Sequence, residues 1–303
     1  MTLTELRYVV ALAQERHFGR AAQKCFVTQP TLSLALAKLE DELGVRLFER
    51  SKNEVLVTPM GAQIVEQARR VLDEVGKIQS LAKGSQDQLA GALRLGVIPT
   101  IGPYLLPELV PILHASAPDM PLMIEENFTG NLVPMLRDGD IDLAIIALPF
   151  TVAGVMTRTL YEEPFSVVVP EGHAWAKKKR VRPDELSGEN LLVLNAGHCF
   201  REQVLEACPG QSNTAYSDGR SGSSLETIRN MVASGLGVSV LPATALEPRY
   251  ATRLVKEIPF TDPVPSRKVA LAWRTSFSRP KAVQAVADAI LAVKLACLRK
   301  VAA

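Results

Sequence analysis

The chain has 303 residues, of which 47% are hydrophobic and 22% are charged, and its formal net charge is +2. This length exceeds one compact core and indicates two or three domains of an ordinary globular protein. The near-neutral balance excludes a uniformly basic nucleic-acid-binding chain, so a nucleic-acid partner has to be argued from where the charges lie.

The start of the chain, Met1–Arg7, has no basic region followed by an apolar run, which argues against a signal peptide. No apolar run approaches the roughly 20 residues of a membrane span. We therefore expect a cytoplasmic protein with no membrane partner. In that compartment a disulfide is more often a transient signal than a structural crosslink.

Residues 1–58 predict a winged helix-turn-helix DNA-binding domain. An alanine-rich segment at 20–25 is followed, after a tight turn, by a helical stretch at 29–40, with Thr28 typed as its N-cap and Pro30 in its first turn. Between Glu15 and Glu40 there is no acidic residue. Four basic residues lie inside that interval: Arg16, Arg20, Lys24 and Lys38. Any one of them alone is better explained as solvated surface, but the whole order favours binding to DNA phosphates.

Two short apolar runs, 44–50 and 55–58, flank the polar residues 51–54. This pattern predicts a small β-hairpin that serves as the wing. Arg50 and Lys52 would then meet phosphate or the minor groove.

Residues 59–90 predict a linker helix and a hinge. Thr58 and Pro59 are a suitable helix start. Apolar residues then recur at alternating steps of four and three: Ile64, Ala68, Val71, Val75, Ile78 and Ala82. This heptad seam favours a homodimer formed through paired linker helices, although packing of the helix on its own domain stays open.

From residue 91 the pattern alternates between strands and helices, which predicts an α/β regulatory domain with a mostly parallel sheet and ends in an amphipathic helix from Lys281 to Leu298. Thr100 and Thr129 come just past the first and second strands. Ligands of open α/β sheets bind at such positions, although capping of a loop is the more common role of a threonine there.

Two cysteines, Cys199 and Cys208, bracket a segment with helical patterning that Pro209 and Gly210 end. Cys199 would lie in the first turn, where free N–H groups favour a thiolate. A helix would separate the two Cα atoms by about 13 Å, at roughly 1.5 Å per residue. A disulfide needs a separation of about 4.4–6.8 Å between the two Cα atoms. The bond would therefore require the helix to unwind, as in a redox switch, but spacing alone favours buried structural cysteines.

The N-terminal motifs resemble those of LysR-type transcriptional regulators. They are Arg20-Ala21-Ala22, Thr28 to Ser33, Lys38 to Gly44 and Leu47 to Arg50. The resemblance implies that Gln29, Pro30, Thr31 and Ser33 enter the major groove, with Lys38, Arg50 and Lys52 among the DNA-binding residues. Leu34 and Leu36 depart from the family, whose members often carry polar residues there, so we expect sparse base contacts and more reading of DNA shape.

The same resemblance implies a regulatory domain, 91–303, with two lobes like a periplasmic binding protein. Lobe I would comprise 91–162 and 268–303, and lobe II 163–267.

Three motifs are similar to those of the peroxide-sensing subfamily. They are Val97 to Pro107, Gly197 to Arg201 and Ser224 to Val232. The resemblance implies that Cys199 reacts with peroxide and Cys208 resolves it, with Thr100, Thr129, His198 and Arg201 supporting the site. It leaves Cys25 and Cys297 as core cysteines. Neither a metal nor a cofactor is expected, because the cysteine and histidine spacing fits no common ligand pattern.

The resemblance further implies promoter DNA, a second copy and a homotetramer, RNA polymerase when activating, hydrogen peroxide, and a thiol reductant such as glutaredoxin or thioredoxin as partners. It implies a regulator and no enzyme. Two alternatives stay open. One is a LysR-type regulator that responds to a small metabolite. The other is a thiol peroxidase, against which the N-terminal DNA-binding pattern counts.

Overall fold

The computed structural model describes residues 1–50, 55–82, 88–208, 221–295 and 297–300. The chain divides into two units, Met1–Gln86 and Asp87–Ala303. The first contains helices α1 (Leu3–Glu15), α2 (Phe18–Lys24), α3 (Gln29–Leu43) and α4 (Pro59–Ala82), and strands β1 (Phe48–Arg50) and β2 (Val55–Val57).

The first unit is the predicted winged helix-turn-helix. The inner face of α3 packs against α1 and α2, where three of its leucines are fully buried: Leu32, Leu36 and Leu39. The wing strands β1 and β2 pair antiparallel, as expected. Buried Glu40 fixes the wing to the end of α3, because its carboxylate accepts the N–H groups of Leu47 at 2.7 Å and Phe48 at 3.1 Å.

The predicted N-cap residue of α3 is confirmed in position, but its side chain does not cap the helix. Thr28 occupies the N-cap position of α3, but its side chain makes no bond to the helix backbone. The Thr28 hydroxyl instead pairs with the Thr31 hydroxyl at 2.8 Å. The exposed first turn of α3 therefore keeps backbone N–H groups that the Thr28 side chain does not cap.

Helix α4 packs on α1, and its residues Val65 and Ala68 are buried. Farther along the helix, Ile78 is 64% exposed. The first part of the apolar stripe thus contributes to the core of its own unit. Ile78, in its later part, is exposed in the single chain, which is compatible with a partner helix.

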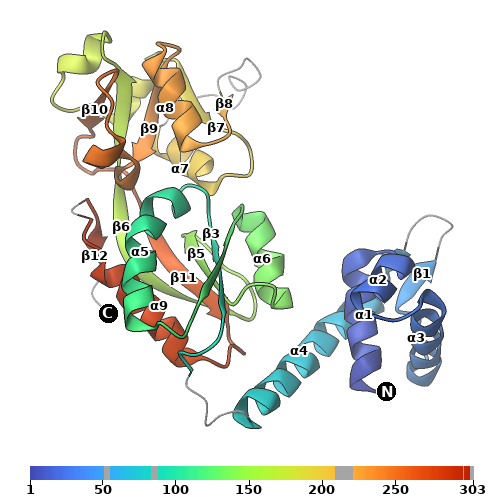
Figure 1. The fold of residues 1–303 in the computed structure, drawn as a ribbon. Coiled ribbons are helices and arrows are strands. Elements are labelled where there is room, and N and C mark those ends of the chain that lie inside the picture. Colours follow the sequence, from blue (N-terminus) through green and yellow to red (C-terminus); the bar gives the residue numbers. More distant parts are fainter. Residues whose placement is uncertain (51–54, 83–87, 209–220, 296, 301–303) are drawn as a thin grey trace. The chain divides into compact units, whose positions relative to one another are not determined.

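The second unit contains a mixed sheet with helices on its faces (Figure 1). Its strands are β3 (Leu93–Val97), β4 (Leu122–Glu126), β5 (Leu143–Ala147), β6 (Val155–Pro170), β7 (Leu191–Leu194), β8 (Ser221–Gly222), β9 (Val238–Pro242), β10 (Val255–Pro259), β11 (Ser266–Arg274) and β12 (Arg299–Lys300). Its α-helices are α5 (Gly102–Ser116), α6 (Thr129–Asp138), α7 (Cys199–Ala207), α8 (Leu225–Ala233) and α9 (Pro280–Ala292).

The sheet runs through two lobes that have separate cores. Strands β4, β3, β5 and β11 lie in the first lobe, where α5 packs beside α9 and α6 covers the opposite face (Figure 1). The long strand β6 pairs with β11 over residues 155–164, and from Phe165 onward it pairs with β9 and β10 of the second lobe. Strands β6 and β11 therefore join the lobes.

The prediction of a mostly parallel sheet was wrong in one respect. Strands β3, β4 and β5 are parallel, and so are β7, β8 and β9, but β11 is antiparallel to β5 and β6. The connecting strands return through the sheet in the opposite direction. This makes the sheet mixed, as in many large sheets.

The last predicted helix is also shorter than expected. Helix α9 ends at Ala292, and Val293 has the extended backbone angles φ −55° and ψ 132°. Val293 and Leu295 are buried in the first lobe, and β12 then pairs with β6. Cys297 consequently lies in a non-helical segment, where it packs against the core of the first lobe.

None of the helices described has the length and apolar character needed to cross a membrane. Within the same described ranges, no three histidine, cysteine or acidic side chains gather in the way a metal ion would require.

Candidate functional site

Helix α7 has a free cysteine at each end. Cys199 is its first residue and Cys208 follows its last. Cys199 is half-buried and packs against the core of the first lobe, whereas Cys208 is 1% exposed and belongs to the core of the second. Nine helical steps separate their Cα atoms by about 13 Å, at roughly 1.5 Å per residue. A disulfide allows a separation of at most about 6.8 Å between the two Cα atoms. A bond between the two sulfur atoms therefore requires α7 to unwind.

The two thiols are not equivalent. Burial raises the pKa of Cys208 to about 12, so this thiol is protonated near neutral pH. Since the thiolate is the nucleophile, Cys208 is unreactive while it stays in the core. Cys199 begins α7, next to backbone N–H groups that have no partner within the helix and that favour a negative charge.

The N-termini of α6 and α7 meet beside Cys199. The ring of Phe128, which precedes α6, packs edge-on against the His198 ring with centroids 4.6 Å apart. Gly197 adopts φ +100°, a left-handed conformation that favours glycine, and an added Cβ would lie 3.7 Å from Phe128. The predicted residue Thr129 follows Phe128 directly as the first residue of α6.

Two predicted residues here have buried polar atoms with no hydrogen-bond partner among the described residues. They are Thr129 Oγ1 and His198 Nδ1. His198 Nε2 lies 3.1 Å from the Ser223 carbonyl oxygen, which can only accept, so Nε2 carries the hydrogen and Nδ1 of the neutral ring is an acceptor. Buried polar atoms are normally paired. Each atom is therefore available to a small polar ligand.

Burial lowers the pKa of His198 below its usual 6.5. The unfolded chain then binds more protons than the folded chain below that pH, so stability rises with pH in this range and declines as the pH falls below about 6.5. We expect H198N to lose less stability than the unchanged protein between pH 7.5 and 5.5, as measured by urea unfolding. H114N, a change at an exposed histidine, should leave the loss unchanged. An equal loss in H198N would contradict the assignment of a neutral His198.

Thr100 is held by a residue that the sequence did not single out. Buried Arg267 donates from Nη1 to Thr100 Oγ1 and from Nη2 to the Thr100 carbonyl, both at 2.8 Å. Its Nε donates to Glu163 at 2.7 Å, and both side chains of this ion pair are fully buried. Thr244 donates to the same carboxylate through its backbone and its hydroxyl. This network joins both lobes at the connecting strands, and Arg267 also lies 5.1 Å from the Phe200 ring centroid.

Arg201 makes contacts within the second lobe. Its Nη1 donates to the Leu194 carbonyl at 3.0 Å, and its Nε lies 3.5 Å from Glu202. Both contacts are to residues of the second lobe. The structure thus packs His198, next to Cys199 in the chain, on Phe128, next to Thr129, and ties Thr100 to Arg267, while Arg201 bonds to the end of β7.

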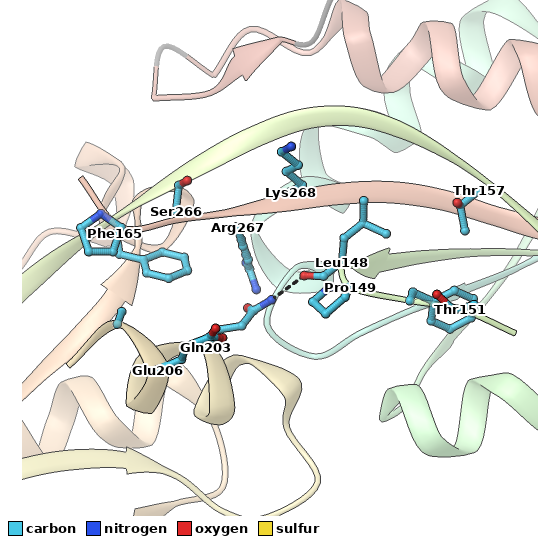
Figure 2. A pocket seen from close by; sticks show the side chains of 13 residues that line it. Leu148, Pro149, Thr151, Thr157, Phe165, Gln203, Glu206, Ser266, Arg267 and Lys268 are labelled. Atoms are coloured by element: carbon cyan, nitrogen blue, oxygen red, sulfur yellow. Dashed lines mark hydrogen bonds between the residues drawn. The ribbon is translucent and has the colours of Figure 1, made fainter. Parts of the chain in front are cut away.

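A cavity of about 770 Å³ lies between the lobes and is lined by residues of both, including Leu148, Thr157, Phe165, Gln203, Arg267 and Lys268. Figure 2 shows Gln203 reaching from α7 to the carbonyl of Leu148, at 3.0 Å. Gln203 Oε1 is buried and, among the described residues, has no partner. The volume of this cavity is typical of sites that bind small molecules.

In the first unit, most of the predicted DNA-binding residues lie at the surface. Gln29, Pro30, Thr31 and Lys38 are exposed along α3, and Ser33 is half-buried. Arg50 ends β1, and Lys52 lies outside the described residues.

Two family models match the chain. The model of a bacterial regulatory helix-turn-helix protein of the lysR family matches residues 3–62, and the model of the LysR substrate binding domain matches residues 86–294. The chain belongs to the LysR family.

Among LysR-family relatives, the chain is 40% identical to the DNA-binding transcriptional dual regulator OxyR of Escherichia coli, over 96% of this chain and 95% of that one. A full-length OxyR cysteine-to-aspartate variant from Pseudomonas aeruginosa has a TM-score of 0.81 and 54% identity, and covers 97% of this chain and 96% of that one. A hydrogen peroxide-bound OxyR cysteine-to-serine variant from Corynebacterium glutamicum has a TM-score of 0.65 and 36% identity, over 96% and 91%. The chain is therefore a redox-sensing transcription regulator of the OxyR type.

Proposed function

We propose that this regulator senses hydrogen peroxide through Cys199 and stores the signal as a Cys199–Cys208 disulfide. The observation that carries the proposal is the placement of two free cysteines at opposite ends of one short helix, each packed in a different lobe. Thr129 Oγ1 and His198 Nδ1 support it, because a peroxide O–H group can donate to the histidine nitrogen and bond to the hydroxyl.

The chemistry has two steps. The Cys199 thiolate attacks one peroxide oxygen, the O–O bond breaks, and the second oxygen leaves as water after it takes up a proton, so that Cys199 becomes a sulfenic acid. Cys208 then attacks that sulfur, an S–S bond forms and the sulfenic oxygen leaves as water. The peroxide gains two electrons and the two thiols lose them. A dithiol reductant such as glutaredoxin or thioredoxin would return them.

The second step requires movement because Cys208 is buried and about 13 Å away along the helix, at roughly 1.5 Å per residue. We infer that α7 unwinds and that the change alters how two regulatory domains pair, which in turn resets the spacing of two recognition helices on promoter DNA. The part of the expected rearrangement at 209–215 lies outside the described residues. Pairing through α4, a tetramer, contact with RNA polymerase during activation and action in the cytoplasm belong to the same proposal.

The first test is mass spectrometry of alkylated protein before and after one equivalent of hydrogen peroxide. We expect a Cys199–Cys208 linkage within seconds. Cys25 and Cys297 provide an internal control, because burial raises the pKa of both thiols and they should stay free. In protein unfolded by urea, hydrogen peroxide should no longer oxidise Cys199 in preference to the other cysteines. Free thiols at both Cys199 and Cys208 after exposure would reject the proposal.

If that result were obtained, the 770 Å³ cavity would favour the second candidate, a regulator that responds to a small metabolite. Its test is stabilisation of the protein by compounds that fill the cavity. Repeated peroxide turnover with thioredoxin would instead support a thiol peroxidase. We propose that the protein is no enzyme and forms its disulfide once for each signal.

A further inference from the structure

The outer face of α3 carries an apolar side chain at its centre. Thr31, Leu34 and Lys38 are spaced by three and four residues, so they lie on one stripe of the helix. Leu34 is 74% exposed, whereas Leu32 and Leu36 on the inner face are fully buried. Leu36 therefore belongs to the core and is unavailable to DNA. Leu34 is the member of the two that faces outward.

The polar groups that read bases are scarce on this helix. Between Gln29 and Lys38, α3 has no amide, carboxylate or guanidinium side chain. Those are the groups that make the specific bidentate contacts to guanine and adenine or accept from cytosine. Between its polar ends, Gln29 and Lys38, the outer stripe presents the hydroxyl of Thr31 and the isobutyl group of Leu34.

The major groove contains one apolar group that distinguishes bases, the C5-methyl of thymine. Contact between an exposed leucine and that methyl group removes both from water and so stabilises the protein–DNA complex. The surrounding charge suits a polyanion, since the chain has no acidic residue between Glu15 and Glu40 and the first turn of α3 contains none. A DNA duplex is therefore the occupant that fits this face.

We propose that Leu34 contacts a thymine methyl group in the major groove and thereby sets part of the operator sequence. The inference depends on DNA binding by the first unit and is independent of the peroxide chemistry, because it concerns the sequence bound and not the redox state.

The test exchanges thymine for uracil, which removes only the C5-methyl. A duplex is first selected from a random-sequence pool by the full-length, reduced protein. Each thymine is then replaced in turn, and the dissociation constant is measured by fluorescence anisotropy at one salt concentration, because affinity depends strongly on salt. We expect replacement at one thymine in each half-site to weaken binding about fourfold per half-site, from about 0.8 kcal/mol per buried carbon.

Variants assign this loss to Leu34. In L34A the thymine and uracil duplexes should bind with equal affinity, because the partner of the methyl is gone. K38A should weaken binding to both duplexes by the same factor, as expected for a phosphate contact. L254A, a change at an exposed leucine of the regulatory unit, should behave as the unchanged protein.

Two results would overturn the proposal. One is equal affinity of the unchanged protein for the thymine duplex and for every uracil duplex. The other is a uracil penalty in L34A as large as that in the unchanged protein. Leu34 is largely exposed and outside the core, so its truncation should leave the first unit folded. Far-ultraviolet circular dichroism of L34A would establish that, and a second variant, L34Q, should also lose the thymine dependence.

Discussion

R267M is expected to lower the free energy of unfolding of the regulatory unit by about 3–5 kcal/mol. The substitution keeps a long side chain but leaves the Glu163 carboxylate fully buried without its cation. It also removes two hydrogen bonds to Thr100. Unpaired charge and unsatisfied acceptors in the interior are both costly.

Urea unfolding followed by tryptophan fluorescence measures this effect in the full chain. Both tryptophans, Trp175 and Trp273, belong to the regulatory unit, so the signal reports that unit alone. R180M is the matched control. It breaks the ion pair with Asp262, whose side chains are 54% and 81% exposed, and should cost less than about 1 kcal/mol.

The double variant R267M/E163L separates loss of the pair from loss of packing. Removing both charges leaves no unpaired charge at this site, so the double variant should recover much of the stability that R267M loses. Similar losses in R267M and R180M would show that the buried pair contributes no more than a surface pair. That outcome would contradict its assignment as the structural link between the lobes.

The local sequence patterns predicted the first unit well. The tight turn before Gln29 and the two strands around 51–54 depend on contacts between residues near in sequence. The sequence did not separate Leu36, which is fully buried, from Leu34, which is exposed. The placement of the two cysteines at the ends of α7 could also be predicted, since helix geometry fixes it once Pro209 and Gly210 are recognised as a stop.

Other features of the fold and the site depend on contacts between residues far apart in sequence, which local patterns do not predict. The first half of β6, 155–164, contains polar and charged residues and becomes a strand because it pairs with β11, more than a hundred positions away. Arg267 and Glu163 look like solvated charges in sequence, and only the crossing of β6 and β11 buries them together. The burial of Thr129 Oγ1 and His198 Nδ1, without a partner among the described residues, likewise depends on tertiary packing such as the contact of Phe128 with His198.

C199S is expected to abolish the response of DNA binding to hydrogen peroxide, because a serine hydroxyl cannot be oxidised to a sulfenic acid. C208S should separate the two chemical steps. In this variant Cys199 should still form a sulfenic acid, visible as the mass of one added oxygen. Without a resolving thiol the disulfide cannot form and α7 has no covalent reason to unwind.

The comparison of the two variants therefore tests the switch itself. We expect peroxide to change the affinity of the unchanged protein for its selected duplex and to leave C208S with the affinity of the reduced state. C297S, which removes a half-buried cysteine that packs against the core of the first lobe, should respond as the unchanged protein does. If C208S kept the full peroxide response, sulfenic acid formation at Cys199 would be sufficient, and the unwinding of α7 would have no part in signalling. If C199S also responded, the site at the start of α7 would be wrong altogether.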